Sequence, residues 1–204
     1  MTIVVIASAN QWQELTAGSS TDVQWIKADT DFSFTSYPDA AAFFVLVQPS
    51  LLNYSATTKP VFINSVTTTL QELNAPENVF RLNGWQTFLQ RPVWEIAGVI
   101  NDDCKAVAQK LNKKIQPVKD EPGFISARIV AMIINEAYFA LGDEVSTTVE
   151  IDTAMKLGTN YPYGPFEWAQ KIGLNNIVVL LQKLSLLDKR YQPAPMLLKA
   201  IQNN

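Results

Sequence analysis

The hydrophobic pattern of the chain changes at residues 119–123, and this change limits the folds that the chain can adopt. Before it, short continuous apolar runs alternate with polar, turn-rich stretches, as is typical of strands buried in a parallel sheet. After it, the apolar residues follow helical spacing. The segment 119–123 carries three charges and ends in Pro-Gly, which breaks regular structure. We therefore predict an α/β domain over residues 1–119 and an all-helical domain over residues 120–204.

The apolar runs of the first domain predict a parallel sheet with both faces covered. The first run follows no lysine or arginine and is shorter than the ~7–15 apolar residues of a signal peptide, so we assign it to a buried strand. Helical spacing predicts a short helix around 69–73 and a longer one over 102–111. The expected strands are 3–6, 23–26, 43–47, 61–63, 93–99 and 115–118.

The first helix of the second domain, expected over 124–141, is apolar on almost all sides. Such a helix must be buried all round, either inside a helical cluster or at a subunit interface. The next helix begins at the capping-box sequence 147–150 and should end at Gly158. Further helices are expected from Pro165 to Gly173, over 175–187, and from Pro195 onward.

Composition excludes several classes of function. The net charge of −3 gives no electrostatic support for a nucleic-acid partner. The chain has no histidine and one cysteine, Cys104, so we expect no metal site, no disulfide and a reducing, cytoplasmic compartment. No apolar stretch approaches the ~20 residues that span a bilayer, so we expect no membrane contact.

Several stretches of the second half carry a recognisable pattern: Asp120-Glu-Pro-Gly-Phe-Ile-Ser-Ala-Arg128, Asn135-Glu-Ala137, Ile151-Asp-Thr-Ala-Met-Lys-Leu-Gly158, Asn160-Tyr-Pro-Tyr-Gly-Pro-Phe166, Ile172-Gly-Leu174 and Arg190-Tyr-Gln-Pro193. Together these stretches resemble the C-terminal domain of 3-hydroxyacyl-CoA dehydrogenases. Their order and spacing agree with that family over roughly residues 76–198. The resemblance implies a Rossmann-type first domain that binds NAD and a helical second domain that forms a homodimer; a monomeric helical core is the alternative.

The family's cofactor site is altered in this sequence. The family has a glycine-rich turn after its first strand, where the absence of side chains lets the pyrophosphate approach a helix N-terminus. Ala7, Ala9 and Trp12 stand at the three glycine positions, and the Trp12 indole should push the helix away from the strand. Asp29 or Asp31 could replace the ribose-binding acid, or be a solvated turn residue. The first domain is also short for a Rossmann domain, so we expect it to be a reduced version with a part missing around 29–36.

The family's catalytic dyad is altered as well. Pro76-Glu-Asn-Val79 matches the strand that precedes the family's histidine, the base that takes the proton from the substrate hydroxyl. Asn83 stands at that position, and Glu95 stands twelve residues later at the position of the family's glutamate, which orients the histidine. Asparagine cannot act as a general base, a contribution of roughly 10²–10⁴ in rate. A family asparagine after Pro-Gly-Phe-Ile is replaced by Ala127.

One further family turn, which contacts cofactor and substrate, appears as Asn64-Ser-Val-Thr67. The candidate catalytic residues are therefore Glu95, Asn83 and Thr67, and the candidate cofactor-binding residue is Asn64. Asn64 and Thr67 could equally be strand-end caps, and Glu95 a satisfied polar group.

Three functions fit these residues. The first is a catalytically degenerate, dimeric protein that needs no cofactor and binds a small, possibly acyl-CoA-like ligand or acts as a scaffold. The second is an active NAD-dependent oxidoreductase with a divergent site, in which Glu95 accepts the proton. The third is a purely structural protein with its interdomain cleft filled by Trp12, Trp85 and Trp94.

Overall fold

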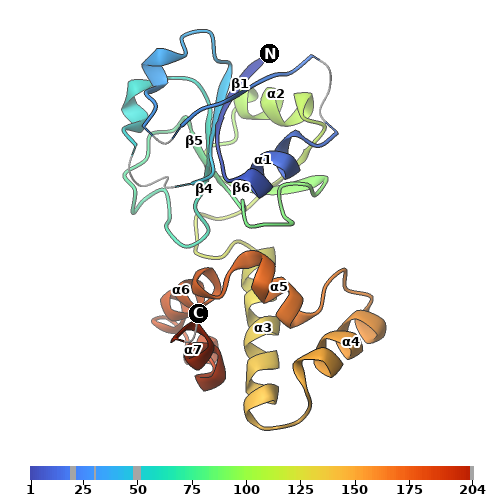
Figure 1. Cartoon of the computed structure of the whole chain (residues 1–204). Helices are drawn as coiled ribbons and strands as arrows, with labels where there is room; N and C mark the ends of the chain where they lie inside the picture. The colour runs from blue at the N-terminus through green and yellow to red at the C-terminus, as the bar shows by residue number, and fades with distance from the viewer. Residues whose placement is uncertain (19–21, 30, 48–51, 203–204) are drawn as a thin grey trace. The chain divides into compact units, whose positions relative to one another are not determined.

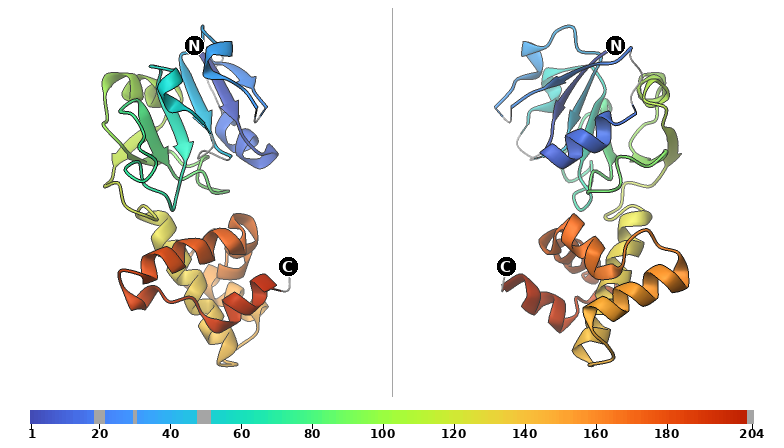
Figure 2. Two further views of the ribbon diagram at one scale, coloured as in Figure 1. Left: turned by 90° about the vertical axis from the view of Figure 1, so that its left-hand side faces the viewer. Right: turned by 45° about the vertical axis from the view of Figure 1, so that its right-hand side comes forward.

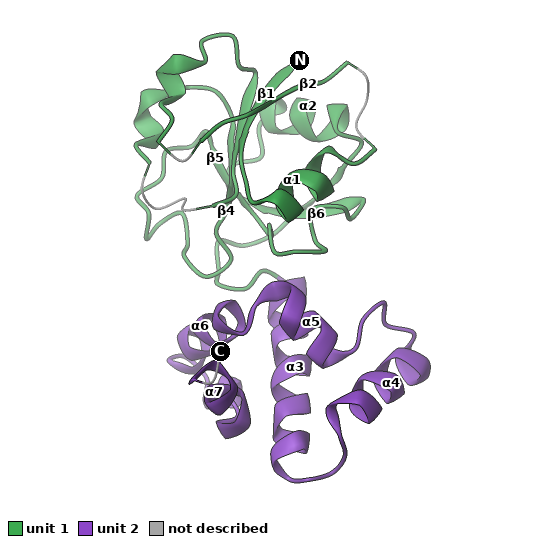
Figure 3. Ribbon diagram, viewed as in Figure 1, with its two compact units in different colours: residues 1–124 green, residues 125–204 purple. Residues whose placement is uncertain are grey.

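The computed structural model describes residues 1–18, 22–29, 31–47 and 52–202. These form two compact units, residues 1–124 and 125–204 (Figure 3). We predicted a division at 119/120; the segment 120–124 lies with the first unit because its side chains and backbone bond to the sheet, as shown below. In the part of the chain that the structure describes, no helix has the length and apolar character needed to cross a membrane.

The first unit is built on a seven-stranded sheet with the order β2-β1-β3-β4-β5-β6-β7. The sheet is mostly parallel, which confirms the predicted Rossmann-type parallel sheet, and β5 and β6 form an antiparallel pair within it. The connection 83–92 between these two strands contains turns and no helix, and parallel pairing would need a longer crossover. The strands are β1 (Thr2–Ile6), β2 (Gln24–Lys27), β3 (Ala42–Val45), β4 (Val61–Asn64), β5 (Val79–Leu82), β6 (Val93–Ala97) and β7 (Lys114–Pro117).

The strand order explains why the first unit is short. A doubly wound dinucleotide-binding sheet has the order 3-2-1-4-5-6, and the order seen here matches it without a strand beyond β2 among the residues that the structure describes. Between β2 and β3, the described residues hold only the 3-10 helix η1 (Phe34–Ser36) as regular structure. The missing part therefore lies in the connection where we expected it.

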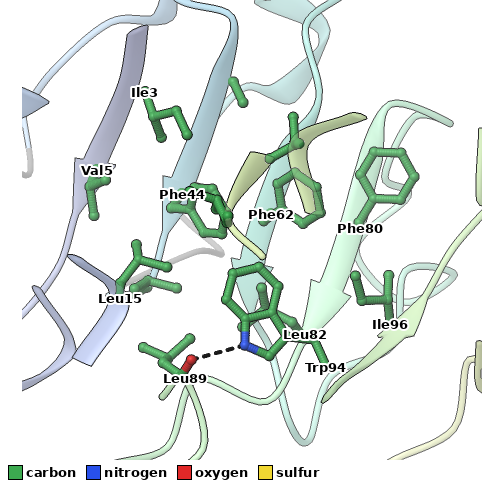
Figure 4. Packing of buried hydrophobic residues seen from close by; sticks show 14 of the residues in the cluster. Ile3, Val5, Leu15, Phe44, Phe62, Phe80, Leu82, Leu89, Trp94 and Ile96 are labelled. Atoms are coloured by element: carbon green, nitrogen blue, oxygen red, sulfur yellow. Dashed lines mark hydrogen bonds between the residues drawn. The ribbon is translucent and has the colours of Figure 1, made fainter. Parts of the chain in front are cut away.

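The two faces of the sheet are covered in different ways (Figures 1 and 2). Helices α1 (Ala9–Thr16) and α2 (Asp102–Lys110) pack on one face through Leu15, Cys104 and Val107. On this face the rings of Phe44, Phe62 and Phe80 stack in a row across three strands, with Trp94 edge-on to Phe44 (Figure 4). The other face is covered by η1, by η3 (Tyr54–Ala56) and by loops rather than by α-helices.

The short helix predicted around 69–73 is a hydrogen-bonded turn instead. Its backbone bonds, from the Leu73 N–H to the Thr69 carbonyl and from the Ala75 N–H to the Leu70 carbonyl, close a single turn. Asn74 then takes a positive φ of 47°, which stops the helix from continuing. Leu70 and Leu73 still pack against the sheet, so the apolar spacing reports burial rather than a helix.

The second unit is all-helical, as predicted. Its elements are α3 (Ser126–Gly142), α4 (Thr148–Thr159), α5 (Pro165–Ile172), α6 (Leu174–Ser185), η4 (Lys189–Tyr191) and α7 (Pro195–Gln202). The capping box at Thr147, the first-turn Pro165 and the terminal Gly173 are confirmed. Helix α4, however, continues through Gly158 and ends at Asn160, which takes the left-handed conformation with φ 57°.

The stretches that carry the family resemblance meet one another inside this unit. The buried carboxylate of Asp152 accepts hydrogen bonds from the backbone N–H groups of Phe166 and Glu167, at 2.8 and 3.1 Å, and so caps α5. A Cβ on Gly164 would lie 2.3 Å from that carboxylate, so this position requires glycine. The buried Asn135 side chain donates to the Gln192 carbonyl and accepts from the Ala194 N–H, at 2.9 and 2.8 Å. The residues of these motifs therefore hold the second unit together through hydrogen bonds between its segments.

Helix α3 is not buried on every side within one chain, so of the two predicted environments it does not have the first, the inside of a helical cluster, and burial at a subunit interface stays a prediction. Its inner face, which includes Val130, Ile134 and Tyr138, is buried. Ile129 keeps 54% of its surface exposed and Phe139 keeps 36%. Ile129 and Phe139 thus mark an apolar stripe of α3 that the rest of the second unit leaves uncovered.

A buried arginine ties the sheet to the segment that follows it. Arg81 of β5 is 0% exposed and forms an ion pair with Asp120. Its guanidinium also donates to the Ser65 carbonyl at 2.8 Å and to the Val66 carbonyl at 3.2 Å, and it lies 4.8 Å from the centre of the Phe124 ring. Arg81 therefore fixes both the turn after β4 and the segment 120–124.

The charges of this pair are set by opposing effects. Burial lowers the pKa of Arg81, and the Asp120 carboxylate opposes that shift. Burial raises the pKa of Asp120, but the Leu70 N–H, the Arg81 guanidinium and the Gln71 N–H together bring this pKa below its usual value. The bonds to the ionised carboxylate outweigh its desolvation, so we expect the pair to be charged at neutral pH.

We expect Asp120→Asn to lower the free energy of unfolding by about 3 kcal/mol at neutral pH, because it leaves a buried guanidinium without its counter-charge. Since the folded-state pKa of Asp120 is depressed, this stabilisation is complete above the unfolded-state pKa and is lost as the pH falls through the folded-state pKa. Urea unfolding at several pH values should show parent and variant converging below about pH 4.

The matched control is Asp102→Asn, which removes an ion pair to Lys105 that is largely exposed. This control should unfold like the parent at every pH. Equal stability of Asp120→Asn and the parent at pH 7 would contradict the organising role of Arg81.

Candidate functional site

The candidate site lies at the carboxyl ends of β1, β3, β4 and β5. In the strand order of this sheet, the chain proceeds from β1 outward to β2 on one side and from β3 outward to β4 on the other. Open α/β sheets bind their ligands in the crevice at such a switch point. The residues that follow these four strands therefore form the first place to look for a site.

Gln11 of α1 fills the switch point between β1 and β3. Its side chain is 9% exposed, and its Nε2 donates to the Leu46 carbonyl at 3.1 Å and to the Gly84 carbonyl at 2.9 Å. Its Oε1 accepts from the backbone N–H and the hydroxyl of Ser8, while Ser8 Oγ accepts the Gln11 N–H. Ser8 and Gln11 thus form a capping box at the start of α1 and link this helix to the ends of β3 and β5.

Asn64 joins the same network from the end of β4. Its Nδ2 donates to the Leu46 carbonyl at 3.1 Å, and its Oδ1 accepts the Gly84 N–H at 3.0 Å. Gly84 approaches Asn64 so closely that a Cβ on Gly84 would lie 2.7 Å from the Asn64 Cβ. The predicted cofactor-binding residue therefore holds together the ends of three strands.

The loop after β5 is fastened to α1 at a second point. The Thr87 N–H donates to Glu14 Oε1 at 2.6 Å, and Thr87 takes a positive φ of 82°, which is unusual for a β-branched residue. A weaker bond of 3.4 Å joins Asn10 and Gln86. Side chains of α1 therefore span the crevice in a place where a dinucleotide fold leaves space for its ligand.

The residues at the three glycine positions also determine whether a pyrophosphate fits at the start of α1. Trp12 turns toward the sheet and packs edge-on against Trp25, with the ring centres 6.4 Å apart, and Lys27 lies 5.8 Å from its ring. Ala7 packs against the same core cluster, and Ala9 is exposed. With Gln11 bonded across the switch point, these residues do not fit a pyrophosphate held as a glycine-rich turn holds it.

The two predicted dyad positions adjoin the β5–β6 ladder, with Asn83 one residue beyond the end of β5 and Glu95 within β6. Arg81 pairs with Ala97 and Leu82 with Ile96 in the antiparallel β5–β6 ladder, and one further step of this register sets Asn83 opposite Glu95. Opposed residues in such a ladder point to the same face of the sheet, with their Cβ atoms about 5 Å apart. Continuation of the ladder by one pair would therefore place these two positions on the same face.

Asn83 is buried and has one unused donor. It is 6% exposed, and its Oδ1 accepts the Trp85 N–H at 3.1 Å. Among the described residues, its Nδ2 has no hydrogen-bond partner. Such a donor costs about 1–3 kcal/mol when it is left unpaired in a folded protein.

The charges near Glu95 come from the loop that precedes β6. Burial lowers the pKa of Arg91, and the carboxylates of Glu95 and Glu14 oppose this shift. The Arg91 guanidinium also lies 4.0 Å from the centre of the Phe88 ring. Glu95 itself is partly buried on β6, and its carboxylate opposes the lowering of the Arg91 pKa.

The remaining predicted residues are less tightly placed. Thr67 lies in the bend after β4, is partly buried, and makes no side-chain hydrogen bond within the described part of the chain. Ala127 is fully buried on α3. Of the three tryptophans proposed to fill a cleft, Trp94 belongs to the sheet core, where its Nε1 donates to the Leu89 carbonyl at 3.0 Å, and Trp12 packs against the same cluster.

The sequence reasoning missed Gln11, Glu14 and Arg81. A signal for Gln11 was present, because Ser8-Ala-Asn-Gln11 matches the capping-box pattern. No comparable signal marked Glu14 or Arg81, since their partners are a backbone N–H 73 residues away and an aspartate 39 residues away.

The fold and the edge site define a reduced dinucleotide-binding sheet that is followed by a helical domain. Comparisons with known proteins show which proteins this chain is similar to. Residues 123–204 match the family model for the C-terminal domain of 3-hydroxyacyl-CoA dehydrogenase. The chain is 39% identical over 114 residues to a 3-hydroxybutyryl-CoA dehydrogenase of Bradyrhizobium diazoefficiens, covering 52% of this chain and 39% of the relative. It is 42% identical over 108 residues to the 3-hydroxyadipyl-CoA dehydrogenase of Escherichia coli, covering 50% of this chain and 23% of the relative.

The fold of the whole chain is also found among solved structures. The crystal structure of Mycobacterium tuberculosis FadB2 superposes with a TM-score of 0.78 at 15% identity and covers 99% of this chain and 93% of that one. The sequence matches span about two fifths or less of the length of the first curated relatives. Residues 123–204 are therefore similar to the C-terminal domain of the 3-hydroxyacyl-CoA dehydrogenase family.

We expect Gln11→Ala to lower the free energy of unfolding by about 1–3 kcal/mol, because it leaves the buried carbonyls of Leu46 and Gly84 without this donor. The control is Gln13→Ala, an exposed position on the same helix with the same chemical change. Urea unfolding measures both. Equal stabilities of the two variants would show that the amide does not hold the crevice closed.

Proposed function

We propose that this chain binds an acyl-CoA-like ligand and does not catalyse hydride transfer. The observation that carries the proposal is Asn83, a buried amide at the position of the family's catalytic base, with a donor that no described residue uses. An amide cannot accept a proton near neutral pH, but it can donate a hydrogen bond. A carbonyl oxygen, such as that of a thioester, is the acceptor that Asn83 Nδ2 would take.

The ligand class comes from the relatives. Two of them are named as dehydrogenases of 3-hydroxybutyryl-CoA and 3-hydroxyadipyl-CoA, and both ligands are thioesters with an oxygen substituent at the 3-position. The family is NAD-dependent, so NAD is the cofactor to test. The capping box at Ser8 and the bridging Gln11 favour a protein that does not need it, because these groups already bond to one another where the pyrophosphate would approach.

The alternative is an active dehydrogenase in which Glu95 accepts the proton. Glu95 is favoured by its register opposite Asn83. This alternative requires a bound nicotinamide, so it predicts NADH binding together with turnover, whereas the first proposal predicts ligand binding without turnover.

The deciding experiment is calorimetric titration of the purified protein with acetoacetyl-CoA. Asn83→Asp keeps the Oδ1 acceptor for the Trp85 N–H and removes the Nδ2 donor, so it is the matched variant. We expect the parent to bind and Asn83→Asp to bind at least about tenfold more weakly, as for the loss of one buried hydrogen bond and the addition of a negative charge. Circular dichroism confirms that the variant is folded.

The same protein is assayed with 3-hydroxybutyryl-CoA and NAD by absorbance at neutral pH. We expect no turnover from the parent or from Asn83→His alone, because base and cofactor site act as a unit. Turnover by the parent would establish the alternative. Absence of acetoacetyl-CoA binding, or equal affinity for Asn83→Asp, would refute the ligand role of Asn83.

Cys104 adds no covalent chemistry to this proposal. The thiol is fully buried, and burial raises its pKa to about 12, with a small opposing effect of Lys105. It therefore stays protonated and unreactive at neutral pH. A cytoplasmic location is in keeping with a free, buried thiol and stays a prediction.

We further propose that the protein is a homodimer through its C-terminal helices. The support is the apolar stripe of α3, where Ile129 and Phe139 stay exposed although the opposite face of the helix is packed. Exposed apolar stripes of this kind are typical of protein–protein contacts.

We expect light scattering to give a dimer mass for the parent and a monomer mass for Ile129→Asp. Ile129 is half exposed in one chain, so the new carboxylate stays solvated in the monomer and would be buried only in the dimer. Val99→Asp, at an exposed apolar position in the other unit, is the control and should remain dimeric. A monomeric parent at micromolar concentration, or a dimeric Ile129→Asp, would rule out this interface.

A further inference from the structure

The first unit contains a pocket that the edge site does not use. It has a volume of about 400 Å³ and lies between η1 and η3, next to the residues that precede β3 and β4. These two strands are parallel, so the pocket is at their amino ends, whereas the candidate site is at their carboxyl ends. Its volume falls in the lower part of the range of small-molecule sites, about 300–1,000 Å³.

The floor of the pocket is aromatic. Phe34 and Phe43 meet edge to face with their ring centres 4.9 Å apart, and Tyr54 lies 6.0 Å from Phe34 behind them. Phe34 and Phe43 are 5% and 1% exposed, so both rings are fixed in the core of this face. Tyr37 adds a third ring to the lining. A flat apolar group is the shape that such a floor accommodates.

One wall is held rigid by hydrogen bonds. The Asn78 side chain donates from Nδ2 to the Thr57 and Lys59 carbonyls, at 3.0 and 2.8 Å. The Lys59 N–H in turn donates to Thr57 Oγ1 at 3.1 Å. The segment that carries Thr57 and Lys59 is therefore fixed before any ligand arrives, which reduces the entropic cost of binding.

The residues at the rim of the pocket favour a negatively charged group. Thr35, Ser55, Thr57 and Thr58 bring hydroxyl groups to it, and Lys59 brings an ammonium group. None of the described residues that line the pocket is acidic, and Lys59 forms no ion pair within the described part of the chain. An anionic group is therefore the polar part of a ligand that this rim would favour.

We propose that this pocket binds a small ligand that consists of a flat apolar ring and one anionic group, with the ring over Phe34 and Phe43 and the anion near Lys59. The proposal does not depend on the function of the edge site, because it concerns the opposite ends of the strands. The pocket follows from the loss of helices on this face, where η1 and η3 leave a hollow between them.

The test is a titration with three probes, followed by backbone amide shifts in ¹⁵N NMR spectra. Benzoate has the ring and the charge, benzamide has the ring without the charge, and cyclohexanecarboxylate has the charge without the flat ring. We expect benzoate to give saturable shifts at residues 34–37 and 55–59 and to bind more tightly than either of the other probes.

Variants separate the two halves of the proposal. Lys59→Met should weaken benzoate binding about two- to fivefold, as expected for one exposed charge pair, and leave benzamide binding unchanged. Ala56→Trp places an indole in the pocket from an exposed position, so it should abolish binding of all three probes. Lys105→Met, on α2 at the other face, is the control and should bind benzoate like the parent. Shifts that do not saturate, shifts at other residues, or equal affinity for benzoate and benzamide would overturn the proposal.

Discussion

The buried guanidinium of Arg81 is the interaction on which the rest of the first unit depends. Arg81 is in the central part of the sheet, and its side chain bonds to the turn after β4, to Asp120 and to the ring of Phe124. The Gly123 N–H donates to the Val66 carbonyl at 2.7 Å and closes the same contact. The side chain of Arg81 therefore fixes the path along which the chain leaves the sheet. Residues 120–124 belong to the first unit, although their composition is typical of a linker.

At the carboxyl edge of the sheet, side chains of α1 form hydrogen bonds within the protein. In a dinucleotide-binding fold, glycines leave the helix N-terminus free to meet a phosphate. Here Ser8 and Gln11 satisfy part of that helix end, and the Gln11 amide continues to the carbonyls of Leu46 and Gly84. Such a network stabilises the fold without a ligand. It also makes a bound dinucleotide compete with hydrogen bonds that the protein already has.

The sequence allowed much of this fold to be predicted, because its strands are continuous apolar runs and its helices carry clear caps, such as Thr147 and Pro165. The features that escaped prediction depend on long-range contacts. The direction of β6 depends on how 83–92 turns, and the apolar spacing at Leu70 and Leu73 fits a packed turn as well as a helix. The pairing of Asn83 with Glu95 follows from the resemblance and its spacing of twelve, and it stays a prediction one step beyond the observed ladder. The closure of the crevice by Gln11 could not be predicted, because the sequence does not distinguish a buried glutamine from an exposed one.

The two ends of the parallel strands therefore differ for one physical reason. A shortened chain has fewer helices with which to cover its sheet, and each exposed end must be covered by what remains. At the carboxyl ends, α1 is present, and its polar side chains close the edge. At the amino ends of β3 and β4, the helices are replaced by η1 and η3, whose aromatic residues cover the sheet but do not fill the space above it. The closed carboxyl edge, with Ala7, Ala9 and Trp12 in place of a glycine-rich turn, and the open aromatic pocket thus both accompany the small number of helices on this sheet.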